Sequence, residues 1–209
     1  MQTFYLIRHG QKQPLPGEPG LTELGHQQAA TTAKFISQLP VNKIFSSPSR
    51  RTLQTAEYIS LATKLPIQVD ALLRERANWG DDPQQSFTQF LDMWGESTQN
   101  RNYIPLVGDS STQAGQRLEQ MVDLIRHDDS MHEQIVLVTH GGVIGDFLRN
   151  LFGDDKLGGF LKALRQHKSG DYEVCECSIT EIVFRHNQPV LKKLASVEHL
   201  EIYIDQRRH

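Results

Sequence analysis

The chain has 209 residues, of which 38% are hydrophobic and 22% are charged, and its formal net charge is −3 at pH 7. This length suits one α/β domain with a large core, with room for an inserted segment. The small negative charge, with both signs spread along the chain, argues against nucleic acid or an anionic membrane as a partner reached through bulk electrostatics.

The cysteines and the first residues of the chain indicate the cellular compartment that we expect. The two cysteines, Cys175 and Cys177, fall two apart in a segment that reads as a strand, so we expect them on one face, without a disulfide framework and with only a weak metal signal. No secretory start and no apolar run of membrane-spanning length occurs. We expect a soluble, cytoplasmic protein with a single domain over residues 1–209.

The first predicted strand, Phe4–Ile7, leads into Arg8-His9-Gly10. Its apolar run lacks alternation, which is typical of a strand buried on both faces of a parallel sheet. Ligands bind at the carboxyl edge of such sheets, so an Arg-His pair there is a candidate site, and Gly10 lets the backbone come close to a bound group. The alternative is a strand-end histidine beside an exposed arginine with no further role.

A loop rich in proline and glycine follows over residues 11–20, and Thr22 then caps a helix that Pro40 ends. Residues 41–45 predict a second buried strand, followed by a helix with Ser47 as N-cap and Pro48 as its first residue. Arg50 and Arg51 then lie in the first turn, where two guanidinium groups and the positive helix end form an anion-binding arrangement. The alternative is two solvated arginines.

A short third strand over 66–69 precedes Arg74-Glu75-Arg76, which taken alone reads as a surface ion pair. Residues 81–111 are expected to form an inserted helix and loop. The helix starts at the Asp82-Pro83 signal, and its aromatic stripe packs on the main domain. Ser110 or Ser111 starts the next helix.

The strongest strand signal is Ile135–Thr139, which ends in His140-Gly141-Gly142 before an apolar helix running to about Phe152. This repeats the construction of the first motif. The glycines at the helix start are expected to leave amide N–H groups free to meet an anion. The alternative is a satisfied core histidine. Two further strands, 172–184 and 189–197, alternate more and are expected to face water in part.

The three strand-end motifs bring histidines and arginines together without a carboxylate cluster or a zinc-type spacing. We therefore expect no metal and no other cofactor. Guanidinium groups, imidazoles and helix N-termini together favour a phosphoryl group as the ligand.

Taken in order, these motifs resemble the histidine phosphatase superfamily in its phosphoglycerate-mutase-like branch. The motifs that carry the resemblance are Leu6-Ile7-Arg8-His9-Gly10, Leu21-Thr22-Glu23-Leu24-Gly25 with Gln28-Ala29, Ser46-Ser47-Pro48 through Arg51 to Thr55-Ala56, Glu75 before Trp79-Gly80, Gly108-Asp109-Ser110, and Thr139-His140-Gly141-Gly142. The resemblance implies a doubly wound α/β fold: a mostly parallel sheet with helices on both faces and a helical insertion near the active site.

The resemblance also implies roles for five residues. His9 would be the nucleophile that carries a phosphoryl group, and Glu75 would protonate the leaving oxygen and then deprotonate water. Arg8, Arg51 and His140 would bind the phosphoryl oxygens. The neighbouring Arg50 would be a bystander.

The sequence departs from the family pattern beside the first motif and at Asp109, where the family has glutamate. Gln11 and Lys12 replace the Glu-Thr of the usual motif, and Leu15 replaces an asparagine. Lys12 then either compensates as a point charge on the substrate or projects into solvent. We add Lys12 and Gly141 to the candidate substrate-binding residues.

The expected function is a metal-independent phosphomonoester hydrolase acting on a phosphorylated small molecule or a phosphoprotein. The resemblance leaves a phosphoglycerate-mutase-type phosphotransferase as an alternative. A binding module that kept the arginines and lost turnover is another, although such a module would not need Glu75. A phosphatase of phosphohistidine proteins is the last.

Overall fold

A six-stranded mixed sheet in the order β3-β2-β4-β1-β5-β6 runs through the chain, in a computed structural model that describes residues 1–127, 133–154, 157, 174–185 and 187–200. The strands are β1 (Gln2–Arg8), β2 (Lys43–Ser46), β3 (Ile67–Val69), β4 (Gln134–Thr139), β5 (Ile179–Arg185) and β6 (Gln188–Ser196). The first four are parallel, and β5 and β6 add antiparallel to β1. The predicted α/β fold with a mostly parallel sheet is confirmed.

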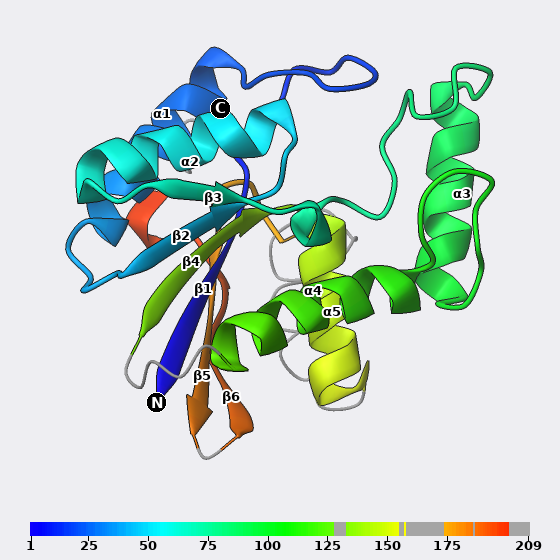
Figure 1. Cartoon of the computed structure of the whole chain (residues 1–209). Helices are drawn as coiled ribbons and strands as arrows, with labels where there is room; N and C mark the ends of the chain where they lie inside the picture. Colours follow the sequence, from blue (N-terminus) through cyan, green and yellow to red (C-terminus); the bar gives the residue numbers. More distant parts are fainter. Residues whose placement is uncertain (128–132, 155–156, 158–173, 186, 201–209) are drawn as a thin grey trace.

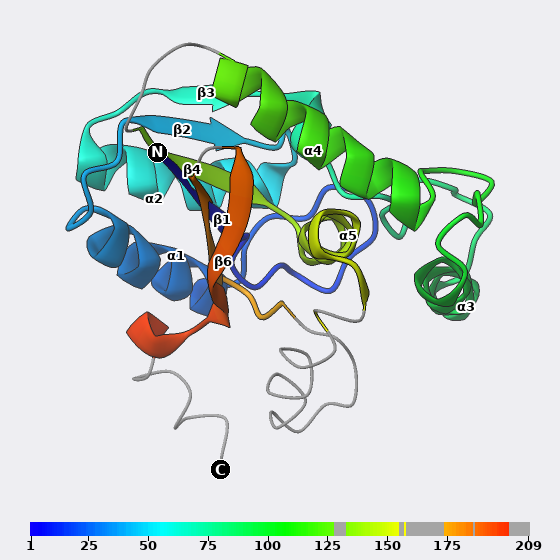
Figure 2. The same ribbon diagram turned by 90° about the horizontal axis from the view of Figure 1, so that it is seen from below.

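Helices cover both faces of this sheet (Figures 1 and 2). They are α1 (Glu23–Ile36), α2 (Arg50–Thr63), α3 (Phe87–Gln99), α4 (Ser111–His127) and α5 (Gly141–Phe152), with short 3-10 turns η1 (Ala71–Leu73) and η2 (Glu198–Leu200). Side chains of β1 alternate between two cores: Phe4 and Leu6 pack in the cluster with α4 and α5, whereas Tyr5 and Ile7 pack in the cluster with α1 and α2. The lack of apolar alternation in β1 therefore reflects burial on both sides.

Helix starts were predicted with mixed success. Thr22 is the N-cap of α1 and accepts a hydrogen bond from the Gly25 amide at 3.0 Å, as predicted. The predicted start of the next helix is wrong, because α2 begins at Arg50 with Ser49 as N-cap and the Ser47 hydroxyl is engaged elsewhere. Arg50 and Arg51 still occupy the first turn.

The segment predicted as an insertion carries α3, which stands beside α4 and α5 at the outer edge of the molecule (Figures 1 and 2). Its predicted start at Asp82-Pro83 is wrong, because a capping box between Ser86 and Gln89 starts the helix at Phe87. The division into a domain over 1–209 and an insertion over 81–111 stays a prediction.

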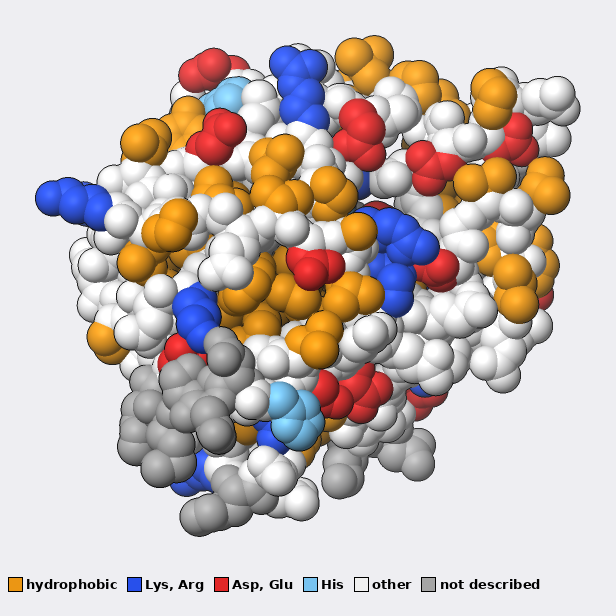
Figure 3. Space-filling view, in the orientation of Figure 1, with side chains coloured by type: hydrophobic (Ala, Val, Ile, Leu, Met, Phe, Trp, Pro, Cys, Tyr) orange, Lys and Arg blue, Asp and Glu red, His pale blue; other side chains and the backbone are white. Residues whose placement is uncertain are grey.

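The aromatic stripe of α3 is only partly packed, because Phe87 and Leu91 are each half exposed. Hydrophobic side chains are accordingly visible along the edge of Figure 3 on which α3 lies. Within the described residues, no helix combines the length and apolar character needed to cross a membrane.

The tail departs from the sequence prediction at the cysteines. Cys175 and Cys177 lie in a turn before β5, not in a strand, and neither forms a disulfide. Cys177 has a φ of +54°, and its amide donates to the Arg8 and His9 carbonyls at 3.0 and 3.3 Å, so the turn closes over the end of β1. Residues 172–173 of the predicted strand lie outside the described residues.

Candidate active site

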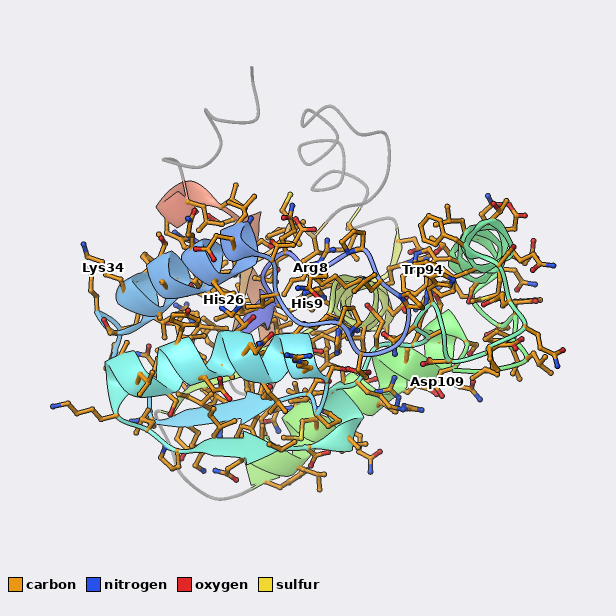
Figure 4. All side chains as sticks on the ribbon, turned by 90° about the horizontal axis from the view of Figure 1, so that it is seen from above. Arg8, His9, His26, Lys34, Trp94 and Asp109 are labelled. Atoms are coloured by element: carbon orange, nitrogen blue, oxygen red, sulfur yellow. The ribbon has the colours of Figure 1, made fainter. Side chains whose placement is uncertain are left out.

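The two strand-end histidines meet because their strands are neighbours. β1 and β4 pair in parallel with Arg8 opposite Thr139, so the next residue on each strand, His9 and His140, reaches the same point of the carboxyl edge. Their ring centroids are 5.3 Å apart, with an interplanar angle of 67°, and both side chains are buried. Figure 4 shows Arg8 and His9 in the middle of the molecule, near the loop that follows them.

The His9 ring is held in one tautomer. Its Nδ1 lies 2.7 Å from the Gly10 carbonyl oxygen, which can only accept, so Nδ1 carries the proton and Nε2 keeps a lone pair. Burial, followed by the charges of Arg8 and Arg51, lowers the pKa of His9 well below 6.5, although the Gly10 contact opposes the shift. His9 is therefore a neutral imidazole whose Nε2 can attack an electrophile.

The His140 ring is fixed by two side chains from the region of α2. Arg51 donates from Nη2 to Nδ1 at 3.0 Å, and the Ser47 hydroxyl lies 2.8 Å from Nε2. An arginine has no acceptor atom, so Nδ1 accepts, and Nε2 carries the proton and donates it to Ser47. Burial, followed by the charge of Arg51, lowers the pKa of His140 well below 6.5.

Arg51 is buried at the start of α2, with 2% of its surface exposed, whereas the adjacent Arg50 is exposed. Besides His140, it donates from Nη2 to the Asn78 side-chain oxygen at 2.6 Å, and its Nη1 lies 3.7 Å from a carboxylate oxygen of Glu18. Burial lowers the pKa of Arg51, and Glu18 is the strongest opposing charge. Arg51 therefore connects α2, the second histidine and two loops.

Arg8 is partly exposed and held by the turn before β5. Its Nη1 donates to the Val174 carbonyl at 2.7 Å, and its Nη2 donates to Glu176 at 3.2 Å. The Nε atom of Arg8 faces the start of α5, where a Cβ on Gly141 would lie 3.3 Å away. Gly141 therefore allows the Arg8 guanidinium to lie against the first turn of α5.

Three guanidinium donors at this point have no hydrogen-bond acceptor among the described residues: Nε of Arg8, and Nε and Nη1 of Arg51. A buried N–H without an acceptor is costly, so these donors are available to a ligand or to water. Unsatisfied cationic donors beside a neutral imidazole nucleophile fit an anion such as a phosphoryl group.

Glu75 is bound to backbone amides. Its Oε1 accepts from the Arg76 and Val143 amides, each at 2.9 Å, and its Oε2 accepts from the Gly142 amide at 3.0 Å. The prediction that the Gly142 amide is free for an external anion is therefore wrong. A Cβ on Gly142 would lie 2.6 Å from Oε1 of Glu75, so the missing side chain gives the carboxylate its access to the helix end.

The two arginines beside Glu75 are occupied elsewhere, so the simple ion pair read from the sequence does not form. Arg74 makes two 3.0 Å hydrogen bonds with Asp109. Arg76 is buried, lies 3.4 Å from Asp146, and stacks 3.7 Å from the Trp94 ring centroid. Burial raises the pKa of Asp146 to about 6, although Arg76 opposes the shift.

Trp94 links α3 to the site. Figure 4 shows its side chain between α3 and the rest of the molecule. A Cβ on Gly142 would lie 2.7 Å from Cη2 of Trp94, so the indole packs against the start of α5 next to Glu75. Arg76 therefore fixes the insertion through Trp94 and fixes Glu75 through its own amide.

Lys12 lies on the same side as the arginines and is only partly exposed. Burial, followed by the charges of Arg51 and Arg8, lowers its pKa, and Glu18 opposes the shift. Leu15 is 53% exposed. Of the two alternatives for Lys12, this position favours a charge near the site.

Sequence reasoning did not assign the contacts of Glu18, Asn78 and Ser47 with Arg51 or His140. The sequence does contain an indication for Glu18, because it is the one carboxylate in a loop that is expected to lie over the strand end. Glu18 also lines a cavity of about 540 Å³ together with Glu75, Asn78 and Asp81. Among the residues that the structure describes, no cluster of three or more His, Cys, Asp or Glu side chains is arranged to hold a metal ion.

Comparison with known families gives one match over nearly the whole chain. The profile described as histidine phosphatase superfamily (branch 1) matches residues 4–197. A curated relative, the probable phosphoglycerate mutase GpmB of Yersinia pestis (strain Pestoides F), is 27% identical over 199 residues, which cover 90% of this chain and 87% of the relative.

Solved structures with the same fold include three of hydrolases or phosphatases. Mycobacterial hydrolase 1 has a TM-score of 0.74 at 20% identity, over 94% of this chain and 99% of its own. A mycobacterial glucosyl-3-phosphoglycerate phosphatase with inorganic phosphate has a TM-score of 0.72 at 22% identity, over 95% and 99%. Phosphoserine phosphatase from Entamoeba histolytica with 3-phosphoglyceric acid has a TM-score of 0.72 at 24% identity, over 96% and 100%. At these identities the similarity establishes the fold.

Proposed function

We propose that this chain, which belongs to the histidine phosphatase superfamily (branch 1), hydrolyses phosphate monoesters through a phosphohistidine on His9 and needs no metal. The observation that carries the proposal is the state of His9: a buried, neutral imidazole whose Nδ1 is held by Gly10 and whose Nε2 has a free lone pair. The unsatisfied donors of Arg8 and Arg51 supply the charge that a phosphoryl group needs.

The proposed reaction has two steps. In the first, Glu75 starts as the carboxylic acid: Nε2 of His9 bonds to phosphorus, the ester P–O bond breaks, and Glu75 gives its proton to the leaving oxygen. In the second, water attacks the phosphohistidine, Glu75 takes back a proton from that water, and the N–P bond breaks to release inorganic phosphate. Both roles are supported by the position of Glu75 on a cavity of about 540 Å³, which has room for an alcohol and for water.

His140 is proposed to take part as a cation. Its Nδ1 accepts from Arg51 in the present state and its Nε2–H is used by Ser47, so a neutral His140 has no proton to offer a substrate. A bound phosphoryl dianion would supply the negative charge that favours protonation of Nδ1. His140 would then donate to a phosphoryl oxygen, and Arg51 would turn to the same group.

Lys12 is proposed to add a point charge at the phosphoryl group, in compensation for the asparagine that Leu15 replaces. Its partial burial near Arg8 and Arg51 supports this role. The Gly141 amide lies at the start of α5 next to Arg8 and is proposed as a further donor.

A mutase-type phosphotransferase is the second candidate, because the curated relative is named a probable phosphoglycerate mutase. The two functions share His9 and Glu75 and differ in whether the phosphohistidine passes its phosphoryl group to an alcohol or to water. Release of inorganic phosphate at the rate of ester loss would identify the hydrolase. A rearranged phosphate ester as the main product would identify the mutase.

The direct test uses a chromogenic phosphate ester with the wild type, with His9→Ala and with His127→Ala. His127 is an exposed histidine at the end of α4, so its variant is a matched control. We expect turnover that resists a chelator, a phosphoryl adduct that is labile in acid, and loss of both in His9→Ala only. Turnover that a chelator abolishes, or that survives in His9→Ala, would contradict the proposal.

A further inference from the structure

The loop over residues 11–20 places a carboxylate, Glu18, at the start of α2. One oxygen of Glu18 lies 3.2 Å from the Ser49 hydroxyl, which donates to it. The other accepts from the Arg50 amide at 3.2 Å and lies 3.7 Å from Nη1 of Arg51. An acidic side chain of the protein therefore occupies the position next to Arg51 that a second anionic group of a ligand would find attractive.

This position is set by the loop's anchors on both sides of Glu18. The Gly17 amide donates to the Trp79 carbonyl at 2.7 Å. On the other side, the Gln13 amide donates to the Gly20 carbonyl at 2.9 Å, and the Leu21 amide donates to the Gln54 side chain at 2.8 Å. The carboxylate is thus presented by an ordered loop, although the side chain itself remains 54% exposed.

The contact with Glu18 neutralises the charge of Arg51 only in part. The Nη1 atom makes an ion pair with Glu18 without a hydrogen bond, and Nη1 and Nε have no acceptor among the described residues. Since Arg51 is 2% exposed, those donors face a site and not solvent. Glu18 and a bound phosphoryl group would therefore share one guanidinium.

One cavity connects Glu18 with the proposed proton donor. Glu18 and Glu75 line the same cavity of about 540 Å³, and Glu75 is the proposed donor to the leaving oxygen. The other charged groups of that cavity are Arg74, Arg76 and Asp81. Both arginines are paired with aspartates, Arg74 with Asp109 and Arg76 with Asp146. Among the described residues that line this cavity, no cation is left unpaired to neutralise the carboxylates of Glu18, Glu75 and Asp81.

Resting on the proposed function, we propose that Glu18 is a specificity-determining residue that selects against phosphate esters carrying a second anionic group close to the phosphoryl group. Like charges on Glu18 and on the leaving group repel across the cavity, and a carboxylate of the substrate would need to displace Glu18 to reach Arg51. Esters whose neighbouring groups are uncharged escape both penalties. In this respect the chain differs from a site built to attract the carboxylate of a phosphoglycerate.

The test compares two substrates of the same carbon skeleton, glycerol 3-phosphate and 3-phosphoglycerate, which differ in a neutral hydroxymethyl group against a carboxylate. It uses the wild type, Glu18→Gln and Glu57→Gln, where Glu57 is an exposed control in the middle of α2. Because Glu18 is half exposed and screened, we expect its removal to raise kcat/KM for 3-phosphoglycerate by roughly threefold to tenfold and to change that for glycerol 3-phosphate less than about twofold. Glu57→Gln should leave the ratio unchanged.

Three results would overturn the proposed role of Glu18 and leave the proposed hydrolase activity untouched. They are an unchanged ratio of the two kcat/KM values in Glu18→Gln, an equal change of that ratio in Glu57→Gln, and a wild-type preference for 3-phosphoglycerate. If neither ester is turned over, calorimetric binding of both ligands to the same variants tests the selection separately, with the same ratio expected. Binding with that ratio but no turnover would remove the hydrolase and support the role of Glu18. Binding of neither ligand would overturn both.

Discussion

Two helices begin at the carboxyl edge of the sheet, and a carboxylate of the protein covers the N-terminus of each. At α5, Glu75 accepts three backbone amides, two of them from the helix itself. At α2, Glu18 accepts one backbone amide and one hydroxyl and stays half exposed. A carboxylate that several amides hold among packed side chains keeps a fixed position. A carboxylate on a loop that is held by two long contacts can be displaced.

The same difference appears in what surrounds each carboxylate. Glu75 is backed by Gly142, by the buried Arg76 and by the Trp94 indole. Glu18 has Arg51 on one side and the open cavity on the other. Two similar helix ends can thus serve different purposes: under the proposed function, α5 would orient a proton donor, and α2 would present cationic donors that Glu18 screens from anionic groups.

Glu75→Gln gives the largest expected effect. A neutral amide keeps an acceptor for the α5 amides but cannot exchange a proton, so kcat for an alkyl phosphate should fall by about 10²- to 10⁴-fold. The fall should be much smaller for a 4-nitrophenyl ester, whose phenolate leaves without protonation. Steady-state rates on both esters, with Glu18→Gln as the companion variant, measure the difference between the two carboxylates. Equal losses in Glu75→Gln and Glu18→Gln would remove the distinction.

Arg51→Lys tests the α2 side. Lysine keeps the charge but cannot contact Asn78, His140 and a phosphoryl group with a planar fork. We expect the inhibition constant for vanadate to rise by roughly 10- to 100-fold, the value of one or two charged hydrogen bonds. Arg50→Lys, one residue earlier and exposed, should change it less than about twofold. A similar loss in both variants would mean that only net charge at the helix start matters.

Gly142→Ala probes how tightly Glu75 is fixed. The added Cβ would lie 2.6 Å from Glu75 Oε1 and 2.7 Å from Trp94, so the carboxylate and the indole must both shift. We expect a loss of about 1–3 kcal/mol in the free energy of unfolding, with a lower kcat and little change in vanadate binding. Gly95→Ala is the control, because its Cβ meets no atom within 4 Å and a helical alanine stabilises. Unfolding curves and steady-state rates of the two variants measure both effects, and equal losses in the two variants would contradict the prediction.

Much of the edge that carries the histidines could be predicted, because it is encoded locally. The apolar runs of β1 and β4 need only burial on both faces to be recognised, and a histidine directly after each run must lie at the carboxyl edge. That the strands are neighbours, with Arg8 opposite Thr139, is a matter of sheet order. The family resemblance implied only that both histidines act on one group, and the pairing of their strands comes from the structure.

The sequence predictions that are wrong concern residues whose structure depends on contacts with residues far away in the sequence. Ser47 has the sequence of an N-cap, but its hydroxyl bonds His140, which is 93 positions away, so α2 starts later. Cys177 has the pattern of a strand, yet its amide closes over the end of β1 with a positive φ. Glu18 could be noticed as a lone loop carboxylate, but its contact with Arg51 follows from where the loop is anchored.

The pH dependence gives the smallest and most discriminating effect. The pKa of His9 is lowered well below 6.5 by burial and by Arg8, so the nucleophile stays neutral as the pH falls through that value. We therefore expect kcat/KM for an alkyl phosphate to show no acid-side decline centred near pH 6.5. An acid-side decline centred near 6.5 in the wild type would instead mean that His9 is protonated in solution, and that Arg8 and Arg51 do not act on its ring.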